Sequence, residues 1–563
     1  MRIYRYYGYY SYYSYFLLLC LFSLVLNTGT NVMAVVDPRN GNLYLHFDDI
    51  VAPGAEQNLE IQRAYNSTSW RIGWFGIGWG CYYETQLIVA ADGSLFVIEH
   101  GNGSTTRYMP DQAGFNAENA AALVVKKIKE KGTGTVSPDA EQKLLERLRG
   151  DVQLRQIYAE SLNISANVPV GSKFSTINKG SSERIERTTR GFERRFPNGR
   201  VEIFSDKGKL ITVLRPNGYR VDIVYDGDVV KQIKDSESKS LVFEWFSDKR
   251  VKNITLGGNK KATYQYENIR LVKSTNALGV TLEYKYTPES RIKTVLYPNK
   301  ISEEYTYTAP MLLVASYKDA NNVLINFKYD RDPKNPNSST TTSTYQDAFG
   351  KPVISKYEYE VKKNSDGEET LIRHAVTTLG VKNEVIYDEK TKLPIEVTKG
   401  GVKEKMTYTA DGLLKEKRYQ NGDFLRYEYH SQHKKISKFE DKSGWAKYDY
   451  DSKGNLTKAS TSVGHDITVL YNSKGLISKV VDNNLLSKAH RVLELENNIM
   501  GKPSKVTVEG VGTIMIEYDN LGAFKEVQYD KKNGERIFKH VRAIVNDFTT
   551  AVSPAGVSLG IAL

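Results

Sequence analysis

Two histidines and one cysteine are the residues of this 563-residue chain whose types and spacing first suggest chemistry. His430 and His433 stand three residues apart, but neither a cysteine nor a third histidine is near them in the sequence, and zinc needs three or four ligands. We interpret them as exposed turn histidines and predict no metal site. Cys81, beside Trp79 and Tyr82, is predicted to be a small buried hydrophobic residue and not a nucleophile.

Four glycines, Gly73, Gly76, Gly78 and Gly80, superficially resemble a dinucleotide-binding loop. That fingerprint needs a helix after it, whereas the stretch Tyr82–Val89 predicts a strand. The sequence has no serine-hydrolase elbow, metalloprotease helix signature or phosphate-binding loop, and its acids are spread through the predicted strands. We therefore predict no cofactor, no catalytic residue and no enzymatic activity.

The elements that must position any site are repeated β-hairpins. From Lys405 to Val480 the chain repeats one phrase four times: KMTYTADGLLKEKRY, FLRYEYHSQHKKISKF, WAKYDYDSKGNLTKAS and ITVLYNSKGLISKVV. Each phrase alternates apolar and polar residues up to an aromatic anchor, breaks at a turn and alternates again, which predicts a hairpin. Most intervals between anchors are 20 to 22 residues, and at least 14 units are legible. The anchors are Phe204, Tyr225, Phe246, Tyr266, Tyr286, Tyr307, Tyr329, Tyr359, Tyr387, Tyr408, Tyr429, Tyr450, Tyr471 and Tyr518.

Such a ribbon must coil or close. Two strands per unit at about 4.8 Å each would make a sheet roughly 130 Å wide, and open sheets rarely exceed about ten strands without curling. We therefore predict a mainly β fold, a coiled ribbon of antiparallel hairpins that forms a hollow or partly filled shell. A second aromatic, two residues before the anchor, shares its face. Both rings are predicted to point inward, as at Tyr284, Tyr305, Tyr357, Tyr427 and Tyr448.

The head of the chain contains the stretches Asp37–Leu43, Arg63–Ser67 and Gly73–Trp79, and its hairpins contain pairs such as Tyr450-Asp451. In these stretches and pairs the chain resembles the successive head landmarks and the YD repeats of the Rhs (rearrangement hot spot) repeat family. The resemblance implies that the repeats coil into a hollow β-shell. The structural residues that it carries over are Asp37, Pro38, Gly41, Asn42, Tyr65, Asn66, Gly76, Gly78 and Trp79, with the anchors Tyr225, Tyr286, Tyr387, Tyr408, Tyr429, Tyr450, Tyr471 and Tyr518.

An insert at residues 110–180 interrupts the β pattern. Residues 120–128 predict one helix, and Ser137 followed by Pro138 predicts the N-cap of a second helix that continues through Ile157. Two helices cannot join a hairpin ladder, so they either plug the shell or project from it, and the sequence leaves both open. Residues 330–344, rich in Pro, Asn, Ser and Thr, predict a polar surface loop that we extend to Tyr345, and residues 364–369 a hairpin tip.

The N-terminus is predicted to be an export signal. Arg2 and Arg5 precede an apolar stretch too short to span a bilayer as a helix, and Ala34 ends a cleavage site. A translation start at Met33 would instead give a cytoplasmic protein. The predicted organisation is a signal peptide (1–34), an Rhs-type N-terminal β region (35–109), the helical insert (110–180), the YD-repeat shell (181–540) and a C-terminal closing segment (541–563).

The C-terminus and the charge complete the expectation. Residues 553–557, Ser-Pro-Ala-Gly-Val, are similar to the Asp-Pro-x-Gly-Leu-type motif at which Rhs shells release a toxin; with Ser in place of Asp, we expect neither self-cleavage nor a covalent toxin. The formal charge is +12, but lysines recur between acids in every repeat, so we predict a solvated face and no nucleic-acid partner.

We predict an exported, non-enzymatic shell that binds or shields a protein or glycan at the cell envelope or outside the cell. One alternative is a toxin-less Rhs effector-delivery component that encapsulates a separately encoded cargo. A second is a glycan-active enzyme within the shell. Because the predicted rings point inward, we expect the ligand within the shell, at its mouth or on the insert, and we hypothesise that binding depends on residues 116–162.

Overall fold

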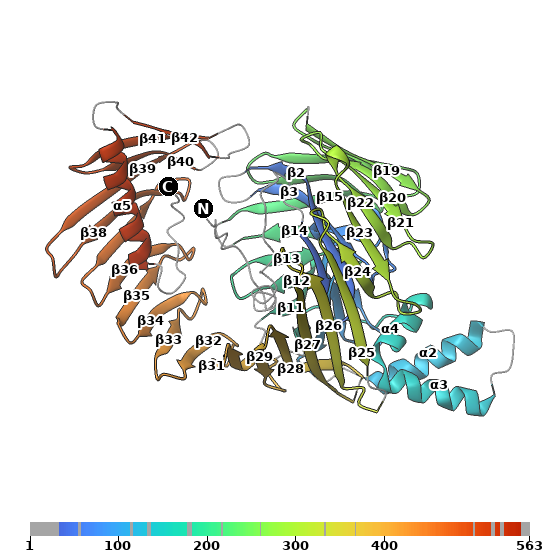
Figure 1. The fold of residues 1–563 in the computed structure, drawn as a ribbon. Coiled ribbons are helices and arrows are strands. Elements are labelled where there is room, and N and C mark those ends of the chain that lie inside the picture. Colours follow the sequence, from blue (N-terminus) through green and yellow to red (C-terminus); the bar gives the residue numbers. More distant parts are fainter. Residues whose placement is uncertain are drawn as a thin grey trace.

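The computed structural model describes residues 33–53, 58–112, 116–131, 137–176, 183–215, 218–258, 260–331, 334–365, 367–498, 502–518, 524–529 and 534–552. One long antiparallel sheet, the ribbon, dominates it, and each strand pairs with the next along the chain (Figure 1). This confirms the predicted mainly β fold of coiled hairpins.

The ribbon starts inside the region predicted as the head. Its first strands are β7 (Gln86–Val89), β8 (Leu95–Ile98), β9 (Thr105–Pro110), β10 (Lys173–Thr176), β11 (Arg184–Thr188), β12 (Gly191–Arg195), β13 (Val201–Phe204) and β14 (Leu210–Leu214). The sheet is closed here, because Gln86 forms a β-bridge with Lys209 and the Leu87 amide donates to the Gly208 carbonyl at 2.9 Å. The 3-10 turns at Tyr82–Glu84, Glu99–Gly101 and Pro298–Lys300 lie between strands.

From there the ribbon continues as a curved wall. Its next strands are β15 (Arg220–Asp226), β16 (Val229–Asp235), β17 (Ser240–Trp245), β18 (Val251–Leu256), β19 (Lys260–Glu267), β20 (Arg270–Thr275), β21 (Thr281–Tyr286), β22 (Ile292–Leu296), β23 (Ser302–Tyr307), β24 (Val314–Lys318), β25 (Leu324–Arg331), β26 (Ser338–Gln346), β27 (Pro352–Lys363) and β28 (Glu369–Thr378). The last are β29 (Val381–Tyr387), β30 (Pro394–Lys399), β31 (Val402–Tyr408), β32 (Leu414–Tyr419), β33 (Phe424–Tyr429), β34 (Ile436–Asp441), β35 (Gly444–Tyr450), β36 (Leu456–Thr461), β37 (Asp466–Tyr471), β38 (Ile477–Asn483), β39 (His490–Asn497), β40 (Pro503–Val508), β41 (Gly512–Tyr518) and β42 (Phe524–Gln528).

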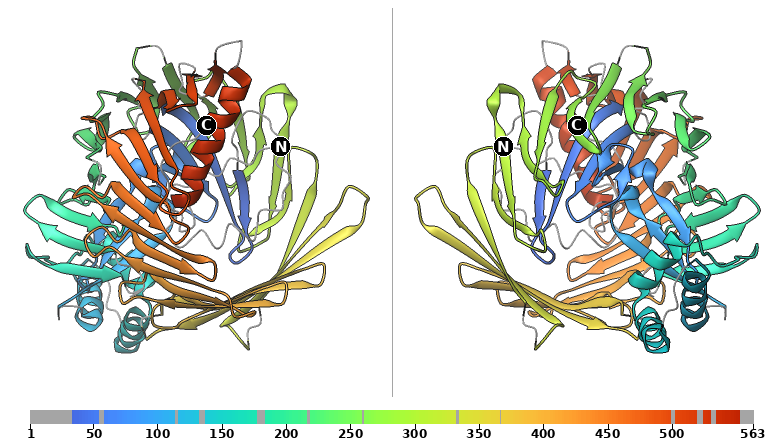
Figure 2. Two further views of the ribbon diagram at one scale, coloured as in Figure 1. Left: turned by 90° about the vertical axis from the view of Figure 1, so that its left-hand side faces the viewer. Right: turned by 90° about the vertical axis from the view of Figure 1, so that its right-hand side faces the viewer.

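A second sheet lies inside the coil. It has the order β1 (Met33–Asp37), β2 (Asn42–Ala52), β3 (Leu59–Asn66) and β6 (Trp79–Cys81), and the short strands β4 (Ile72–Gly73) and β5 (Gly76–Ile77) form a separate pair. Its buried face joins ribbon side chains from β7 to β24 in one hydrophobic core. Figure 2 shows these blue strands standing within the curl, so one end of the shell is filled. The predicted signal cleavage after Ala34 falls inside β1, and residues 1–32 lie outside the described part of the chain.

A C-terminal helix, α5 (Gly534–Val552), lies on the same inner face near the other end of the ribbon (Figure 2). Its buried Val541, Val545 and Phe548 share a core with strands β34 to β41. The sequence reading missed this helix and placed a domain boundary at residue 540, which lies within α5.

The insert forms three helices where two were predicted: α2 (Ala117–Lys131), α3 (Pro138–Gly150) and α4 (Val152–Ser161). Ser137 caps α3 as expected, but Asp151 caps a new helix because its side chain accepts a hydrogen bond from the Leu154 amide at 2.9 Å. Helices α2 and α3 project from the shell in Figure 1, which decides between the two alternatives.

Two further expectations are wrong. The predicted loop at 330–344 is mostly strand, since β25 runs to Arg331 and β26 starts at Ser338; Tyr345 pairs with Val353 within the ladder. β-Branched threonines, which favour strands, outweigh the polar composition there. The anchor assigned to Phe246 is instead Trp245, whose indole N–H donates to the Val230 carbonyl at 2.6 Å. At the hairpin tip predicted for residues 364–369, the Asn364 amide donates to the Glu368 carbonyl at 3.0 Å between β27 and β28, as a hairpin requires.

Candidate binding surface

The anchor tyrosines occupy one repeated geometry. At almost every unit the strand pairing shifts register directly before the anchor, which marks a β-bulge. The anchor hydroxyl then donates to a backbone carbonyl 14 or 15 residues earlier, for instance Tyr286 to Leu271 at 2.7 Å and Tyr450 to Ile436 at 2.7 Å. The same bond is made by Tyr225, Tyr266, Tyr307, Tyr329, Tyr408, Tyr429, Tyr471 and Tyr518. Tyr387 differs, because its hydroxyl lies 3.2 Å from Nδ1 of His374.

The head landmarks make contacts within the inner sheet and with the ribbon strands in which that sheet is seated. Gly41 lies against Leu313, and its carbonyl accepts from the Val314 amide at 2.9 Å. A side chain at Gly76 would meet the Ile269 carbonyl carried by the β19–β20 turn. Three landmarks contact ribbon strands directly: the Pro38 carbonyl accepts from the Thr341 hydroxyl, the Tyr65 hydroxyl accepts from the Ile292 amide, and the Trp79 indole N–H donates to the Tyr286 hydroxyl. The Asn66 side-chain amide donates to the Asn102 carbonyl in the turn before β9. The others act within the inner sheet: the Asp37 carbonyl closes the β1–β2 turn, the Asn42 side chain accepts from the Ser67 hydroxyl, and Gly78 lies under the Tyr65 ring. All of them are structural contacts.

A buried ion pair lies at the centre of this seat. The Arg63 guanidinium pairs with Asp49, and both side chains are almost fully buried. The Tyr264 hydroxyl donates to Asp49 at 2.7 Å, and the Trp79 ring lies 4.7 Å from the guanidinium. Sequence reasoning missed this pair because its members sit singly within ordinary strands.

Carboxylates paired in a pocket inside the shell would favour the glycan-active enzyme, so the partners of the buried carboxyl groups matter. Glu84 accepts from the backbone amides of Trp74 at 2.6 Å and Cys81 at 3.0 Å; burial raises its pKa to about 8, although these bonds oppose the rise. Glu303 accepts hydroxyl bonds from Tyr297, Tyr305 and Tyr317, and burial raises its pKa. Each carboxyl is held by groups of the fold, which favours a structural role for both.

A third buried set surrounds Arg194. Its guanidinium pairs with Glu99 at 2.7 Å, Glu183 at 3.0 Å and Glu202 at 3.1 Å. Burial raises the pKa of Glu99, while Arg194 lowers it. The arrangement ties β12 to β13 and to the turn after β8, and it too is a structural network.

The two histidines and the cysteine considered first in the sequence do not belong to these buried networks. The rings of His430 and His433 stack in the β33–β34 turn, with 5.0 Å between their centroids. Both side chains are half-buried, whereas the sequence analysis predicted exposed ones. Within the described residues no three His, Cys, Asp or Glu side chains gather as a metal ion would require. Cys81 is buried, as predicted, and burial raises the pKa of its thiol well above the ordinary value.

The inner face of the ribbon is covered unequally. In most repeats a second aromatic residue stands two positions before the anchor. This residue is buried against the inner sheet at Tyr264, Tyr284 and Tyr305, and it is also buried at Tyr448. Between these regions Tyr427 is only half-buried. The strands around it are orange in Figure 2 and form part of the floor between the blue inner strands and the red helix α5.

This floor presents an apolar surface that we call the inner strip. It consists of half-buried side chains from four adjacent strands, β31 to β34: Tyr408, Leu414, Leu425, Tyr427 and Ile436. Register places them on the anchor face, because Tyr408 opposes Leu414 and Tyr427 opposes the inward-facing Phe439. In the described part of the chain, the cluster that holds Tyr408 and Leu414 contains ribbon residues alone.

The insert offers a second surface, outside the shell. Val152 of α4 packs on Phe96 of β8 and on Ala90, which follows β7. Phe96 points away from the main core, because its neighbours Leu95 and Val97 point into that core from the opposite face of β8. Arg155 of α4 also pairs with buried Asp92 at 3.0 Å. These contacts fix the insert on the outer face of the ribbon.

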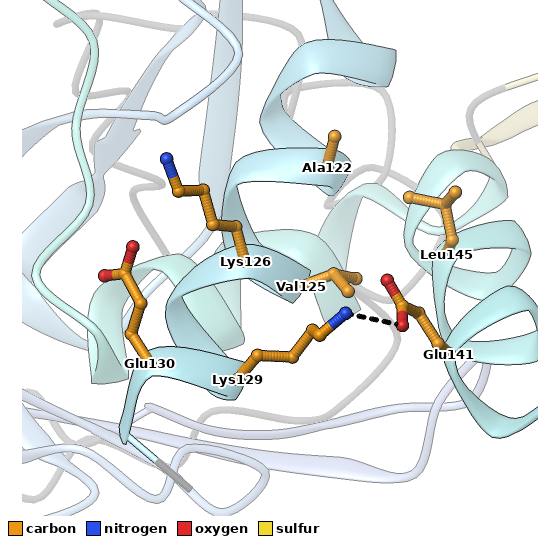
Figure 3. Close-up of a pocket in the computed structure, with 7 residues that line it drawn as sticks. All are labelled: Ala122, Val125, Lys126, Lys129, Glu130, Glu141 and Leu145. Atoms are coloured by element: carbon orange, nitrogen blue, oxygen red, sulfur yellow. Dashed lines mark hydrogen bonds and ion pairs between the residues drawn. The ribbon is translucent and has the colours of Figure 1, made fainter. Parts of the chain in front are cut away.

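A pocket of about 440 Å³ lies between α2 and α3 (Figure 3). Ala122, Val125 and Leu145 supply its apolar lining, and Lys129 pairs with Glu141 across it at 2.9 Å. Its position, within residues 116–162, keeps the insert as a separate candidate for binding.

Comparison with known proteins gives fold-level likenesses. Residues 34–108 match the family described as "Domain of unknown function (DUF6531)". No curated protein matches the chain. The crystal structure of TcdB2-TccC3 without its hypervariable C-terminal region is similar at 12% identity and a TM-score of 0.37, over 88% of this chain and 28% of that one. The Photorhabdus luminescens Tc holotoxin pore is similar at 11% identity and a TM-score of 0.31, over 87% of this chain and 28% of that one.

This chain therefore spans little more than a quarter of the length of those solved structures. At these TM-scores the likeness carries no functional argument, and function has to be argued from the chain's own geometry. Among the described residues, no helix combines the length and the apolar character needed to cross a bilayer.

Proposed function

We propose that this chain is an exported, non-enzymatic β-shell that holds a protein partner against its concave inner face. The observation that carries the proposal is the inner strip, a half-exposed apolar surface between two regions of the same face that the chain covers with its own elements. A repeated face that is buried at both ends and carries five half-buried apolar side chains between them has apolar surface to offer a partner.

The size of the strip supports binding. Burying a large apolar side chain completely is worth about 1.5–3 kcal/mol, so each of these partly exposed residues leaves at most about 1 kcal/mol to be gained. The five side chains of the strip together offer at most roughly 5 kcal/mol before the costs of association. Additional contacts are needed for tight binding, and the concave wall around the strip (Figure 2) gives room for them.

The chemistry of the strip favours a polypeptide over a glycan. A glycan needs polar partners for its hydroxyl groups, but the Tyr408 hydroxyl already donates to the Pro394 carbonyl at 2.6 Å. Tyr429, beside the strip, likewise donates to the Leu414 carbonyl at 2.7 Å. With the Tyr408 and Tyr429 hydroxyls engaged, these two residues present their rings, and Leu414, Leu425 and Ile436 present aliphatic groups, which match apolar side chains of a protein.

Site-specific photo-crosslinking in the producing cells tests the proposal. We would introduce p-benzoylphenylalanine in place of inner Tyr427 and, as a matched control, in place of Trp445, which is 38% exposed on the neighbouring hairpin. The register places Trp445 on the outer face, opposite Glu440. A discrete protein adduct from position 427 alone supports the proposal. Adducts from both positions, or from neither, contradict it.

A further inference from the structure

We propose that an apolar patch on one rim of the ribbon docks the protein on an anionic lipid surface. The patch, which we call the rim patch, consists of Trp445, Val463, Leu485 and Leu486, and these residues are between 38% and 71% exposed. Strands β35 to β39, which carry them, lie on the side of the molecule away from the insert (Figure 1). The rim patch is separate from the inner strip, so this inference does not rest on the proposed function.

Three neighbouring hairpins bring the rim patch together. The Ser462 amide, in the β36–β37 turn, donates to the Trp445 carbonyl at 2.8 Å. The Leu485 amide, in the β38–β39 turn, donates to the Gly464 carbonyl at 2.7 Å. Val463 stands between Ser462 and Gly464, and therefore lies between the tryptophan and the leucines. The four apolar side chains thus form one continuous surface.

The two leucines are held out by the structure of their own turn. The β38–β39 turn is the longest of the three turns, so it extends furthest from the rim. The Asn484 side chain accepts hydrogen bonds from the amides of Leu486 at 3.0 Å and Ser487 at 2.8 Å. The Asn484 amide also donates to the Ala489 carbonyl at 2.9 Å. These bonds fix the turn with two large apolar side chains in water, at a place where turns ordinarily carry polar residues.

Cations lie beside the apolar residues. Lys488 follows the leucines within the same turn and is exposed. Lys447 is exposed on the same face of β35 as Trp445, and its ammonium lies 5.2 Å from the centre of the Trp445 ring. Tryptophan and lysine suit the boundary between water and lipid, because the indole packs among headgroups and the ammonium attracts lipid phosphates. The rim patch therefore combines apolar tips with cations that match anionic headgroups.

The acids around the rim patch are engaged within the fold. Asp441 accepts hydrogen bonds from two amides of its own turn, at 2.8 Å and 3.0 Å. Glu440, opposite the tryptophan in the register, pairs with Lys438 at 3.2 Å. Asp466 pairs with Lys458 at 3.0 Å. Because these carboxylates are held or balanced locally, the two lysines of the rim patch set the charge that a lipid surface meets.

A bilayer suits this shape better than a second copy of the chain. Convex turns that meet convex turns bury little area, whereas a stable protein interface buries about 1,600 Å² in total. A bilayer deforms around an apolar tip, and its binding strengthens with the apolar area buried and with the attraction of anionic headgroups. The longest turn leads, so Leu485 and Leu486 enter the lipid while Trp445 and the lysines stay at the headgroups.

Flotation of the full chain with lipid vesicles tests the proposal. The vesicles contain phosphatidylcholine and phosphatidylglycerol in equal parts, and vesicles of phosphatidylcholine alone serve as the uncharged comparison. We expect the wild type to float with the anionic vesicles and Leu486→Ser to weaken this binding about tenfold. Met311→Ser is the matched control and should leave binding unchanged. Met311 is 63% exposed in the β23–β24 turn, which lies on the opposite rim because successive turns of a hairpin ribbon alternate between its rims.

A charge reversal tests the role of the headgroups. Lys488→Glu should lower binding to the anionic vesicles and leave vesicles of phosphatidylcholine alone unaffected. Lys474→Glu is the control, because Lys474 is exposed in the β37–β38 turn on the opposite rim. Added salt should weaken binding to the anionic vesicles for the same reason.

A fluorescence measurement gives a readout at the rim patch itself. An environment-sensitive fluorophore on Leu486→Cys should shift its emission to shorter wavelength when anionic vesicles are added, because it enters the lipid. The same fluorophore on Met311→Cys should keep its emission. Circular dichroism melting of both serine variants shows whether each keeps the fold of the wild type.

Four results would overturn the inference: no flotation of the wild type, equal binding to charged and uncharged vesicles, equal losses in Leu486→Ser and Met311→Ser, or no emission shift from position 486. A dimer in analytical ultracentrifugation that Leu486→Ser dissociates, without flotation, would assign the rim patch to a second copy and would overturn it as well. The proposed function is tested separately, because docking of the rim on lipid gives no protein adduct at position 427.

Discussion

The anchor hydroxyl bond should be measurable at Tyr450. Its ring is half-buried beside His430, and its hydroxyl donates to the Ile436 carbonyl at 2.7 Å. Removing a fully buried aromatic ring costs about 3–5 kcal/mol, so half-burial gives about 2 kcal/mol, and the hydrogen bond adds about 1 kcal/mol. We expect Tyr450→Phe to lower the free energy of unfolding by about 1 kcal/mol and Tyr450→Ala by about 3 kcal/mol.

Urea unfolding followed by circular dichroism gives the global value, and amide hydrogen exchange across β34 and β35 gives the local one, which matters because repeat arrays need not unfold as one unit. Tyr345→Phe is the control. Tyr345 lies in a strand, and no described residue accepts a hydrogen bond from its hydroxyl, so this change should cost little. If Tyr450→Phe costs as much as Tyr450→Ala, or no more than Tyr345→Phe, the reasoning about the anchors is wrong.

Four other predictions concern the buried ion pair, Glu84, the insert and the N-terminus. Asp49→Asn should lower the free energy of unfolding in urea by about 3–5 kcal/mol, because it leaves Arg63 buried without its counter-ion. Lys143→Ala, in an exposed ion pair, should lower it by less than about 1 kcal/mol. Similar losses for the two variants would refute the claim that the Arg63–Asp49 pair holds the inner sheet in the ribbon. Burial raises the pKa of Glu84 from 4.5 to about 8 in the folded protein, so the stabilisation by Glu84 is present below pH 4.5 and is lost as the pH rises through about 8. Between these two pH values the melting temperature of Glu84→Gln should therefore rise relative to that of the wild type. A difference in melting temperature that does not change with pH would argue against the raised pKa. Deleting residues 116–162 should leave crosslinking from position 427 intact, and its loss would place the partner on the insert. Mass spectrometry of the exported protein should find Val35 as the first residue; an untrimmed Met1 would contradict the predicted signal.

The sequence predicts the anchors correctly where each repeat is marked by its residue types. Tyr408, Tyr429, Tyr450 and Tyr471 are anchors in the structure because an aromatic, an alternating strand and a turn recur together. Period alone misplaced the anchor at Phe246, since the bulge before Trp245 shifts the pairing by one residue. A bulge depends on two strands together and cannot be located from one.

Other features were beyond a repeat-based reading. The stripe of α5, with Ile537, Val541, Val545 and Phe548, does carry a helical period, and that signal could have revealed the helix before the structure did. The inner strip carries no such signal. Tyr427 and Tyr448 occupy the same place in the repeat, yet Tyr448 is buried and Tyr427 is half-buried, a difference that the repeat itself does not predict.

The most direct test of the central claim is an electron cryomicroscopy map of the protein purified with its partner from the producing cells. The account predicts additional density on the inner strip, between the inner sheet and α5, in contact with Leu425 and Tyr427. A map in which the partner lies on the outer face or on the insert, with the strip bare or filled by residues of this chain, would contradict it.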